Sequence, residues 1–179
     1  MSNKKKKKKQ VVIDNTIKYN DNTVIEDYAS EDFIMYKSLE PIKDILIREK
    51  CKDRNIKFSK ELALNLDKVE IEKKKKTPHM DNTVDLVIGL DNKQLLLVEA
   101  KYDAQNMENI ARDIHKKIKH SRELLVSNPK FVSLYNKKII LLHSEKIEEN
   151  KRRLMSYLKN DISFHPLTNT ELYSTYFEH

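Results

Sequence analysis

Three charged residues, Asp85, Glu99 and Lys101, stand in the largely hydrophobic stretch formed by residues 83–102. Two buried carboxylates that lie close together repel each other, and a divalent cation such as Mg²⁺ or Mn²⁺ relieves both the repulsion and the burial. A lysine beside them could hold a phosphate oxygen or an attacking water. These three residue types together predict metal-dependent phosphodiester hydrolysis.

That chemistry requires the chain to bring the three residues together, and a β-hairpin would do so. Short apolar runs at 84–88 and 95–98 are separated by turn-forming residues, which predicts two strands joined by a tight turn. Apolar residues on both faces predict a hairpin at the centre of a sheet covered by helices. If Leu90 pairs with Gln94, Asp85 falls opposite Glu99, with Lys101 on the same face as Glu99.

Asp85, thirteen intervening residues and then Glu99-Ala100-Lys101 at the end of a hydrophobic strand resemble the motif of the PD-(D/E)XK nuclease superfamily. This superfamily includes restriction endonucleases, junction resolvases and RecB-type exonuclease domains. The resemblance implies an α/β fold with a three-layer, restriction-endonuclease-like αβββαβ core, in which helices flank a mixed central sheet. The proline that often precedes the aspartate is absent, because Thr83-Val84 stand there.

The resemblance also implies roles for single residues. Asp85 and Glu99 would bind the metal, the Ala100 carbonyl would add a ligand, and Lys101 would aid the attacking water or stabilise the transition state. The superfamily commonly places a further acidic residue on its first core helix. Glu40 is our preferred candidate for this acid, and Glu49 is the alternative.

The remaining elements follow from hydrophobic periodicity and helix-boundary signals. Residues 30–51 are predicted to be helical, with Ser30 as N-cap and Pro41 kinking or splitting the helix. Residues 61–72 alternate in two registers, which predicts the first strand with a turn or bulge at Asp67-Lys68. The other predictions are a small hairpin or arm at 11–29, a helix at 106–126, a strand at 138–143, a helix at 145–158 capped by Ser144, a strand at 162–164 and a tail at 167–179 packed on the core.

Two basic segments are candidates for contact with nucleic acid. The four lysines at 73–76 precede the Asp85 strand and could contact phosphates, although a solvated turn explains them equally well. His79 could assist a phosphate or a metal, although a loop histidine is more often structural. Gln105 matches a position at which RecB-like members carry glutamine. Residues 4–9 supply six of the seven net positive charges, so the rest of the chain is nearly neutral and its basicity is weak support for nucleic-acid binding.

Composition limits the other possibilities. The length of 179 residues fits a disordered lysine-rich tail at 1–10 and a single domain at 11–179. With only one glycine, the chain contains neither a P-loop nor a dinucleotide-binding motif. The single cysteine, Cys51, fits a reducing compartment, and no apolar run approaches the ~20 residues of a membrane span, so we expect a cytoplasmic protein.

The leading hypothesis from the sequence is a magnesium- or manganese-dependent nuclease whose substrate is DNA. The alternative is a catalytically idle nucleic-acid-binding or protein-interaction module on the same fold. A metal-free carboxylate acid/base enzyme is a third hypothesis, and an ordinary hairpin in which Asp85 pairs with Lys101 would explain the charges without any site. RNA as the substrate and a homodimer as the assembly are both open at this point.

Overall fold

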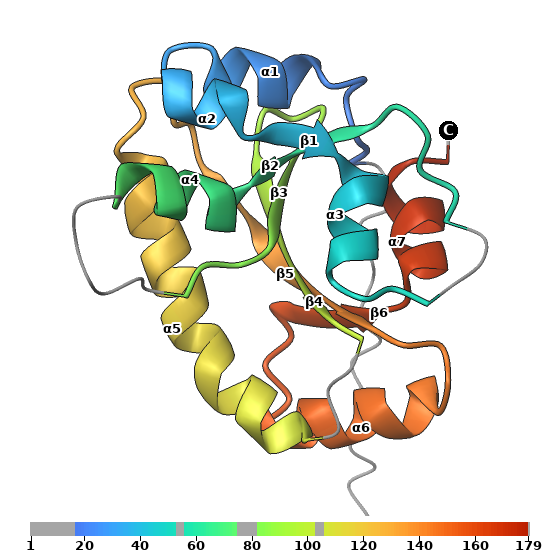
Figure 1. Cartoon of the computed structure of the whole chain (residues 1–179). Coiled ribbons are helices and arrows are strands. Elements are labelled where there is room, and N and C mark those ends of the chain that lie inside the picture. The colour runs from blue at the N-terminus through green and yellow to red at the C-terminus, as the bar shows by residue number, and fades with distance from the viewer. Residues whose placement is uncertain (1–16, 53–55, 75–81, 103–105, 179) are drawn as a thin grey trace, which may run out of the picture.

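A six-stranded mixed sheet forms the centre of the computed structural model, which describes residues 17–52, 56–74, 82–102 and 106–178 (Figure 1). The strands are β1 (Leu39–Pro41), β2 (Leu62–Asn65), β3 (Leu86–Gly89), β4 (Leu95–Lys101), β5 (Leu134–Leu142) and β6 (Phe164–Leu167), and they are ordered in the sheet as in the sequence. Neighbours from β1 to β4 are antiparallel, whereas β4, β5 and β6 run parallel.

Helices cover both faces of this sheet. They are α1 (Thr23–Ala29), α2 (Phe33–Lys37), α3 (Ile42–Arg48), α4 (Leu66–Lys73), α5 (Met107–Val126), α6 (Ile147–Tyr157) and α7 (Asn169–Tyr176). On one face α3 and α7 share a hydrophobic cluster, and the other five helices contribute to clusters on the opposite face. None of the helices within the described residues is both long and apolar enough to cross a membrane.

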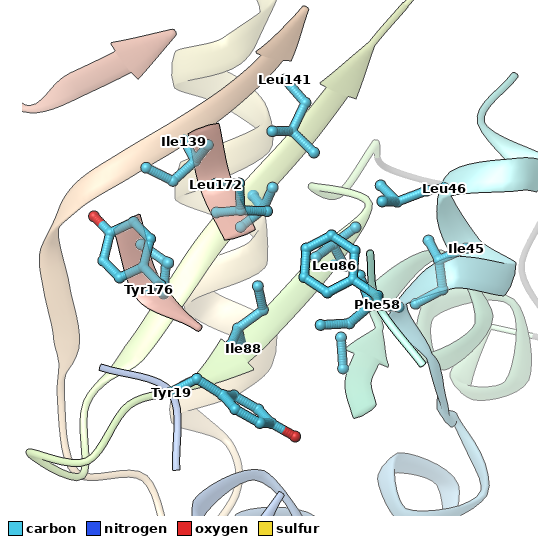
Figure 2. Packing of buried hydrophobic residues seen from close by; sticks show 14 of the residues in the cluster. Tyr19, Ile45, Leu46, Phe58, Leu86, Ile88, Ile139, Leu141, Leu172 and Tyr176 are labelled. Atoms are coloured by element: carbon cyan, nitrogen blue, oxygen red, sulfur yellow. The ribbon is translucent and has the colours of Figure 1, made fainter. Parts of the chain in front are cut away.

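The face under α3 and α7 holds the largest single hydrophobic cluster. Figure 2 shows side chains from β3 and β5 meeting those of α3 and α7, with Leu86, Ile139 and Leu172 among them. In β3 and β4 the even-numbered residues belong to this cluster, whereas Val87, Leu95 and Leu97 belong to the cluster on the opposite face. This alternation is the period of two expected of strands buried on both sides.

The predicted hairpin is confirmed in its register. Leu86 pairs with Val98 and Val87 pairs with Leu97, and the Leu90 amide donates to the Gln94 carbonyl across 2.9 Å. Extending this register by one residue brings Asp85 opposite Glu99 on the odd-numbered face, which is the face that α5 covers. The strand itself begins at Leu86 rather than at Val84, so Asp85 stands immediately before it.

Gly89 ends β3 where α1 passes unusually close. A Cβ at this position would lie 2.7 Å from the Ile25 backbone nitrogen and 2.9 Å from the Val24 Cβ. The only glycine of the chain is therefore required by the close approach of a helix rather than by the turn that follows it.

The predicted helical segment at 30–51 is split near Pro41 as expected, but a short strand, which was not predicted, divides it. Asp32, not Ser30, caps α2, and its side chain accepts from the amides of Ile34 and Met35. Ser30 instead ends α1. Pro41 closes the short edge strand β1, a position in which its missing amide proton is tolerated.

The predicted strand over 61–72 is correct only to Asn65. The Asn65 side chain accepts from the Lys68 amide and so begins α4, which overrides the alternating pattern. Val69 is buried on this helix, whereas Ile71 is about half exposed. Asp67 consequently lies in the first turn of a helix and not in a bulge.

The C-terminal half follows the predictions more closely. Helix α5 agrees with the predicted 106–126, whereas β5 begins at Leu134 and β6 passes through Pro166 at the edge of the sheet. Lys146 in a left-handed conformation precedes α6, so Ser144 is not its cap. The tail forms α7 with a capping box of Thr168 and Glu171. Within the predicted hairpin or arm at 11–29, Thr23–Ala29 forms α1, and the preceding Tyr19 is buried and bridges to Leu90. The predicted tail at 1–10 lies outside the described residues.

Candidate metal centre

The hairpin brings Asp85, Glu99 and Lys101 together as the sequence predicts. The Ala100 amide donates to Asp85 Oδ2 across 2.5 Å, and the Lys101 ammonium lies 2.5 Å from Glu99 Oε1. Asp85 is 4% exposed and Glu99 is 1% exposed. Two buried carboxylates and a partly buried ammonium therefore meet at one end of the central hairpin. The contact of Ala100 with Asp85 runs through its amide, and its predicted carbonyl ligation stays a prediction.

Two further carboxylates, Glu49 and Asp67, join Asp85. One oxygen from each of the three residues lies within 4.8 Å of the others. Glu49 follows the last turn of α3, where the chain turns away through Lys50 at a φ of 64°. The negative end of a helix dipole disfavours a carboxylate there, so the placement of Glu49 does not serve the stability of α3.

Asp67 is held in place from the neighbouring segment. It lies in the first turn of α4, a position that favours a negative charge, and its Oδ1 accepts from the buried Thr83 hydroxyl across 2.5 Å. Thr83 precedes Asp85 by two residues, so one short segment orients the side chain of Asp67 and carries Asp85 itself.

Glu40 has a different environment. It lies on β1, where its carboxylate accepts from Arg48 across 2.7 Å and from Asn65 and Lys68 across 3.0 Å. Although partial burial opposes it, these hydrogen bonds hold the pKa of Glu40 at about 2. Of the two candidate acids from this part of the chain, Glu49 belongs to the carboxylate cluster, and within the described residues Glu40 does not.

Lys117 is a member of the site that the sequence reasoning missed. It extends from α5 to within 2.7 Å of Glu99 Oε1 and 4.0 Å of Asp85 Oδ1, and its side chain is 15% exposed. From the sequence alone, Lys117 is one of several basic residues between the apolar positions of the predicted helix at 106–126. Its spacing gives the missed signal, because Lys117 follows buried Ile114 by three residues and precedes buried Ser121 by four.

Ser121 fixes α5 against the hairpin at this point. Its side-chain oxygen accepts from the Val84 amide across 2.9 Å, and Ser121 is fully buried. The helix that carries Lys117 is therefore bonded to the residue next to Asp85, and this contact sets the height of Lys117 along the sheet.

Electrostatic interactions in the cluster favour the charged form of Lys101 and disfavour the charged forms of Asp85 and Glu49. Burial, and then the proximity of Glu99, raise the pKa of Asp85 against the opposing effects of Lys101 and Lys117. Burial and the neighbouring Asp67 likewise raise the pKa of Glu49. Burial alone would lower the pKa of Lys101, but Glu99 and Asp85 outweigh it and the pKa is raised.

These side chains fit a hard divalent cation. Mg²⁺ and Mn²⁺ prefer carboxylate oxygens, and a cation would relieve the repulsion that raises the pKa of Asp85. Glu99 Oε2 is buried and has no hydrogen-bond partner in the described part of the chain. This buried carboxylate oxygen beside a cluster of acids is available to a further ligand.

The basic segment before the hairpin is only partly described. Lys73 pairs with Asp32 across 2.8 Å and Lys74 pairs with Glu70 across 2.7 Å, so both have protein partners. Residues 75 and 76, His79 and Gln105 lie outside the described residues. Their contact with phosphates stays a prediction.

The fold and the site define a mixed α/β protein with an acidic, lysine-containing cluster at its central hairpin. No protein-family model matches the chain, and no similar curated protein or solved structure is found. Function is therefore inferred from the side chains that converge at this cluster.

Proposed function

We propose that the chain is a metal-dependent nuclease that hydrolyses phosphodiester bonds in DNA. The observation that carries the proposal is the convergence of Glu49, Asp67, Asp85 and Glu99 with Lys101 at one end of a buried hairpin. In a purely structural network, each buried polar atom would be expected to have a hydrogen-bond partner. Glu99 Oε2 is buried and has none within the described residues.

The order of elements supports the same proposal. The run α3, β2, β3, β4, α5, β5 is compatible with the αβββαβ order that the resemblance to PD-(D/E)XK nucleases implies, with α4 as an insertion between β2 and β3. In this arrangement Glu49 supplies the acid of the first core helix, and the insertion supplies Asp67. The proposed fold assignment and the proposed chemistry thus concern the same residues.

Each residue has a distinct task in the proposed reaction. Asp85, Glu49 and Asp67 would hold the divalent cation, and Glu99 Oε2 is a further oxygen within the same cluster. When bound, Mg²⁺ would neutralise charge on the phosphate and lower the pKa of an attacking water. Lys101 keeps its proton because its pKa is raised, so it acts as a fixed positive charge towards the phosphate and not as a base.

The test is cleavage of plasmid, linear, single-stranded and branched DNA with Mg²⁺ or Mn²⁺. Asp85→Ala and Lys101→Ala should fold normally and lose cleavage by about 10²–10³-fold or more, because each removes a preorganised charge. Lys116→Ala removes an exposed lysine from α5 and should cleave like the wild type. Equal cleavage by the wild type and Lys101→Ala would refute the assignment, and DNA binding without any cleavage would favour the idle binding module.

A further inference from the structure

Two ammonium groups converge on a single oxygen of Glu99. Lys101 Nζ lies 2.5 Å and Lys117 Nζ lies 2.7 Å from Oε1. The two lysines come from different elements, β4 and α5, and one of them would suffice to pair with one carboxylate. The position of the second ammonium therefore calls for a separate explanation.

Lys117 occupies the region between the two motif carboxylates. Its ammonium is 2.7 Å from Glu99 Oε1 and 4.0 Å from Asp85 Oδ1. A cation shared by Asp85 and Glu99 would need oxygens of both residues at about 2.0–2.1 Å, which is the coordination distance of Mg²⁺. Such a cation would lie against the ammonium of Lys117, and the two positive charges would repel each other strongly in this buried setting.

Asp85 also belongs to a second group of carboxylates, whose other members have no contact with Lys117 among the described residues. In this group Glu49 and Asp67 bring their oxygens within 4.8 Å of an Asp85 oxygen. Asp85 thus places an oxygen at short range from those of Glu49 and Asp67, while Lys117 lies between Asp85 and Glu99.

The charges of the cluster lead to the same division. Among the described residues it contains four carboxylates, those of Glu49, Asp67, Asp85 and Glu99, and the ammonium groups of Lys101 and Lys117. With all groups ionised, two negative charges remain, which one divalent cation balances. A second divalent cation would leave two excess positive charges in the site, whereas without the Lys117 ammonium it would leave one.

We propose that Lys117 takes the place of a second metal ion, so that the site binds one divalent cation, between Asp85, Glu49 and Asp67. The proposal rests on the cation site of the proposed nuclease but not on its catalytic activity. In this arrangement the Lys117 ammonium stays on Glu99 when the cation binds, and it supplies at that position the positive charge that a second ion would otherwise bring.

The test counts Mn²⁺ ions per chain by electron paramagnetic resonance of the free ion during a titration of the full chain. The wild type should bind one Mn²⁺. Lys117→Met, which keeps most of the side chain but removes its charge, should bind two. Lys117→Arg keeps the charge and should bind one, and Lys119→Met is the matched control, because Lys119 lies on the same helix with its side chain 80% exposed.

Two Mn²⁺ ions in the wild type would overturn the proposal, as would a single ion of unchanged affinity in a folded Lys117→Met. If Lys117→Met fails to fold, Lys117→Gln, which also removes the charge but keeps a polar end, should bind two Mn²⁺ and decides in its place. One Mn²⁺ per chain together with no cleavage of DNA would refute the proposed nuclease and leave the role of Lys117 intact.

Discussion

The burial of Asp85 should make the metal-free protein less stable than a variant that lacks this carboxylate. Burial and the neighbouring Glu99 raise the pKa of Asp85 from 3.8 to about 8. Between these two pH values the native state keeps a proton that the unfolded state has lost. Because the native state binds more protons there, the free energy of unfolding falls as the pH rises through this window.

Asp85→Asn isolates this effect. Asparagine has nearly the shape of aspartate, and its Oδ1 can still accept from the Ala100 amide that now donates to Asp85. Each unit of raised pKa corresponds to about 1.4 kcal/mol, so the shift sets an upper bound of about 6 kcal/mol above pH 8. Relaxation around a buried charge reduces such penalties, and we expect a gain on the order of 3 kcal/mol.

Urea unfolding with EDTA at pH 4.5 and pH 8.5 measures the difference. The two proteins should be nearly equally stable at pH 4.5, and Asp85→Asn should be more stable at pH 8.5. Asp91→Asn, an exposed change in the hairpin turn, should behave like the wild type at both pH values. Adding Mg²⁺ at pH 8.5 should stabilise the wild type and leave Asp85→Asn unchanged, since binding to the native state alone raises its stability.

If the free energy of unfolding of Asp85→Asn has the same pH dependence as that of the wild type, Asp85 ionises freely in the native protein. An Asp85→Asn protein that is less stable at both pH values would show that the carboxylate stabilises the fold. Either result would remove the electrostatic reason for placing a cation beside Asp85, and the cluster would then be a structural network of charges.

Two other predictions concern residues outside the proposed reaction. Gly89→Ala should lower the free energy of unfolding by about 1–3 kcal/mol in urea titrations, because the new Cβ would meet the Ile25 backbone nitrogen 2.7 Å away. An unchanged urea midpoint would mean that α1 can move away from β3 without cost. Glu40→Gln should leave Mn²⁺ binding intact but lose about 1 kcal/mol of stability at pH 7, after allowance for solvent screening. Since the pKa of Glu40 is lowered to about 2, its contribution is present above pH 4.5 and should vanish as the pH falls towards 2, which unfolding curves at both extremes would reveal.

The hairpin could be predicted from the sequence because its signals are local. Apolar runs, a short turn and the constant sum of paired residue numbers were enough to bring Asp85 opposite Glu99. The same reasoning placed Lys101 correctly, since it only required counting two residues along one strand. Helix α5 was equally accessible, because its apolar stripe repeats over 20 residues.

The rest of the site depends on contacts that no short stretch encodes. Asp67 joins Asp85 only because Asn65 begins a helix where the alternating pattern suggested a continuing strand. Glu49 was a candidate, but its choice over Glu40 required knowing that β1 ends the first helical segment and α3 begins a new one. Lys117 could in principle have been identified from the sequence, because it lies on the buried stripe of α5. The many other lysines of this helix made it hard to distinguish from solvent-exposed ones.

The proposed cation site draws its oxygens from two kinds of element: the hairpin, which forms from neighbouring residues, and α3 and α4, which precede it in the chain. A partly folded chain in which only the hairpin had formed would bring together Asp85, Glu99 and Lys101. Because Lys101 partly neutralises the two carboxylates, such a chain would have little affinity for Mg²⁺. Cation binding thus waits for the docking of Glu49 and Asp67. If the chain hydrolyses DNA as proposed, its activity would require α3 and α4 to be docked beside the hairpin.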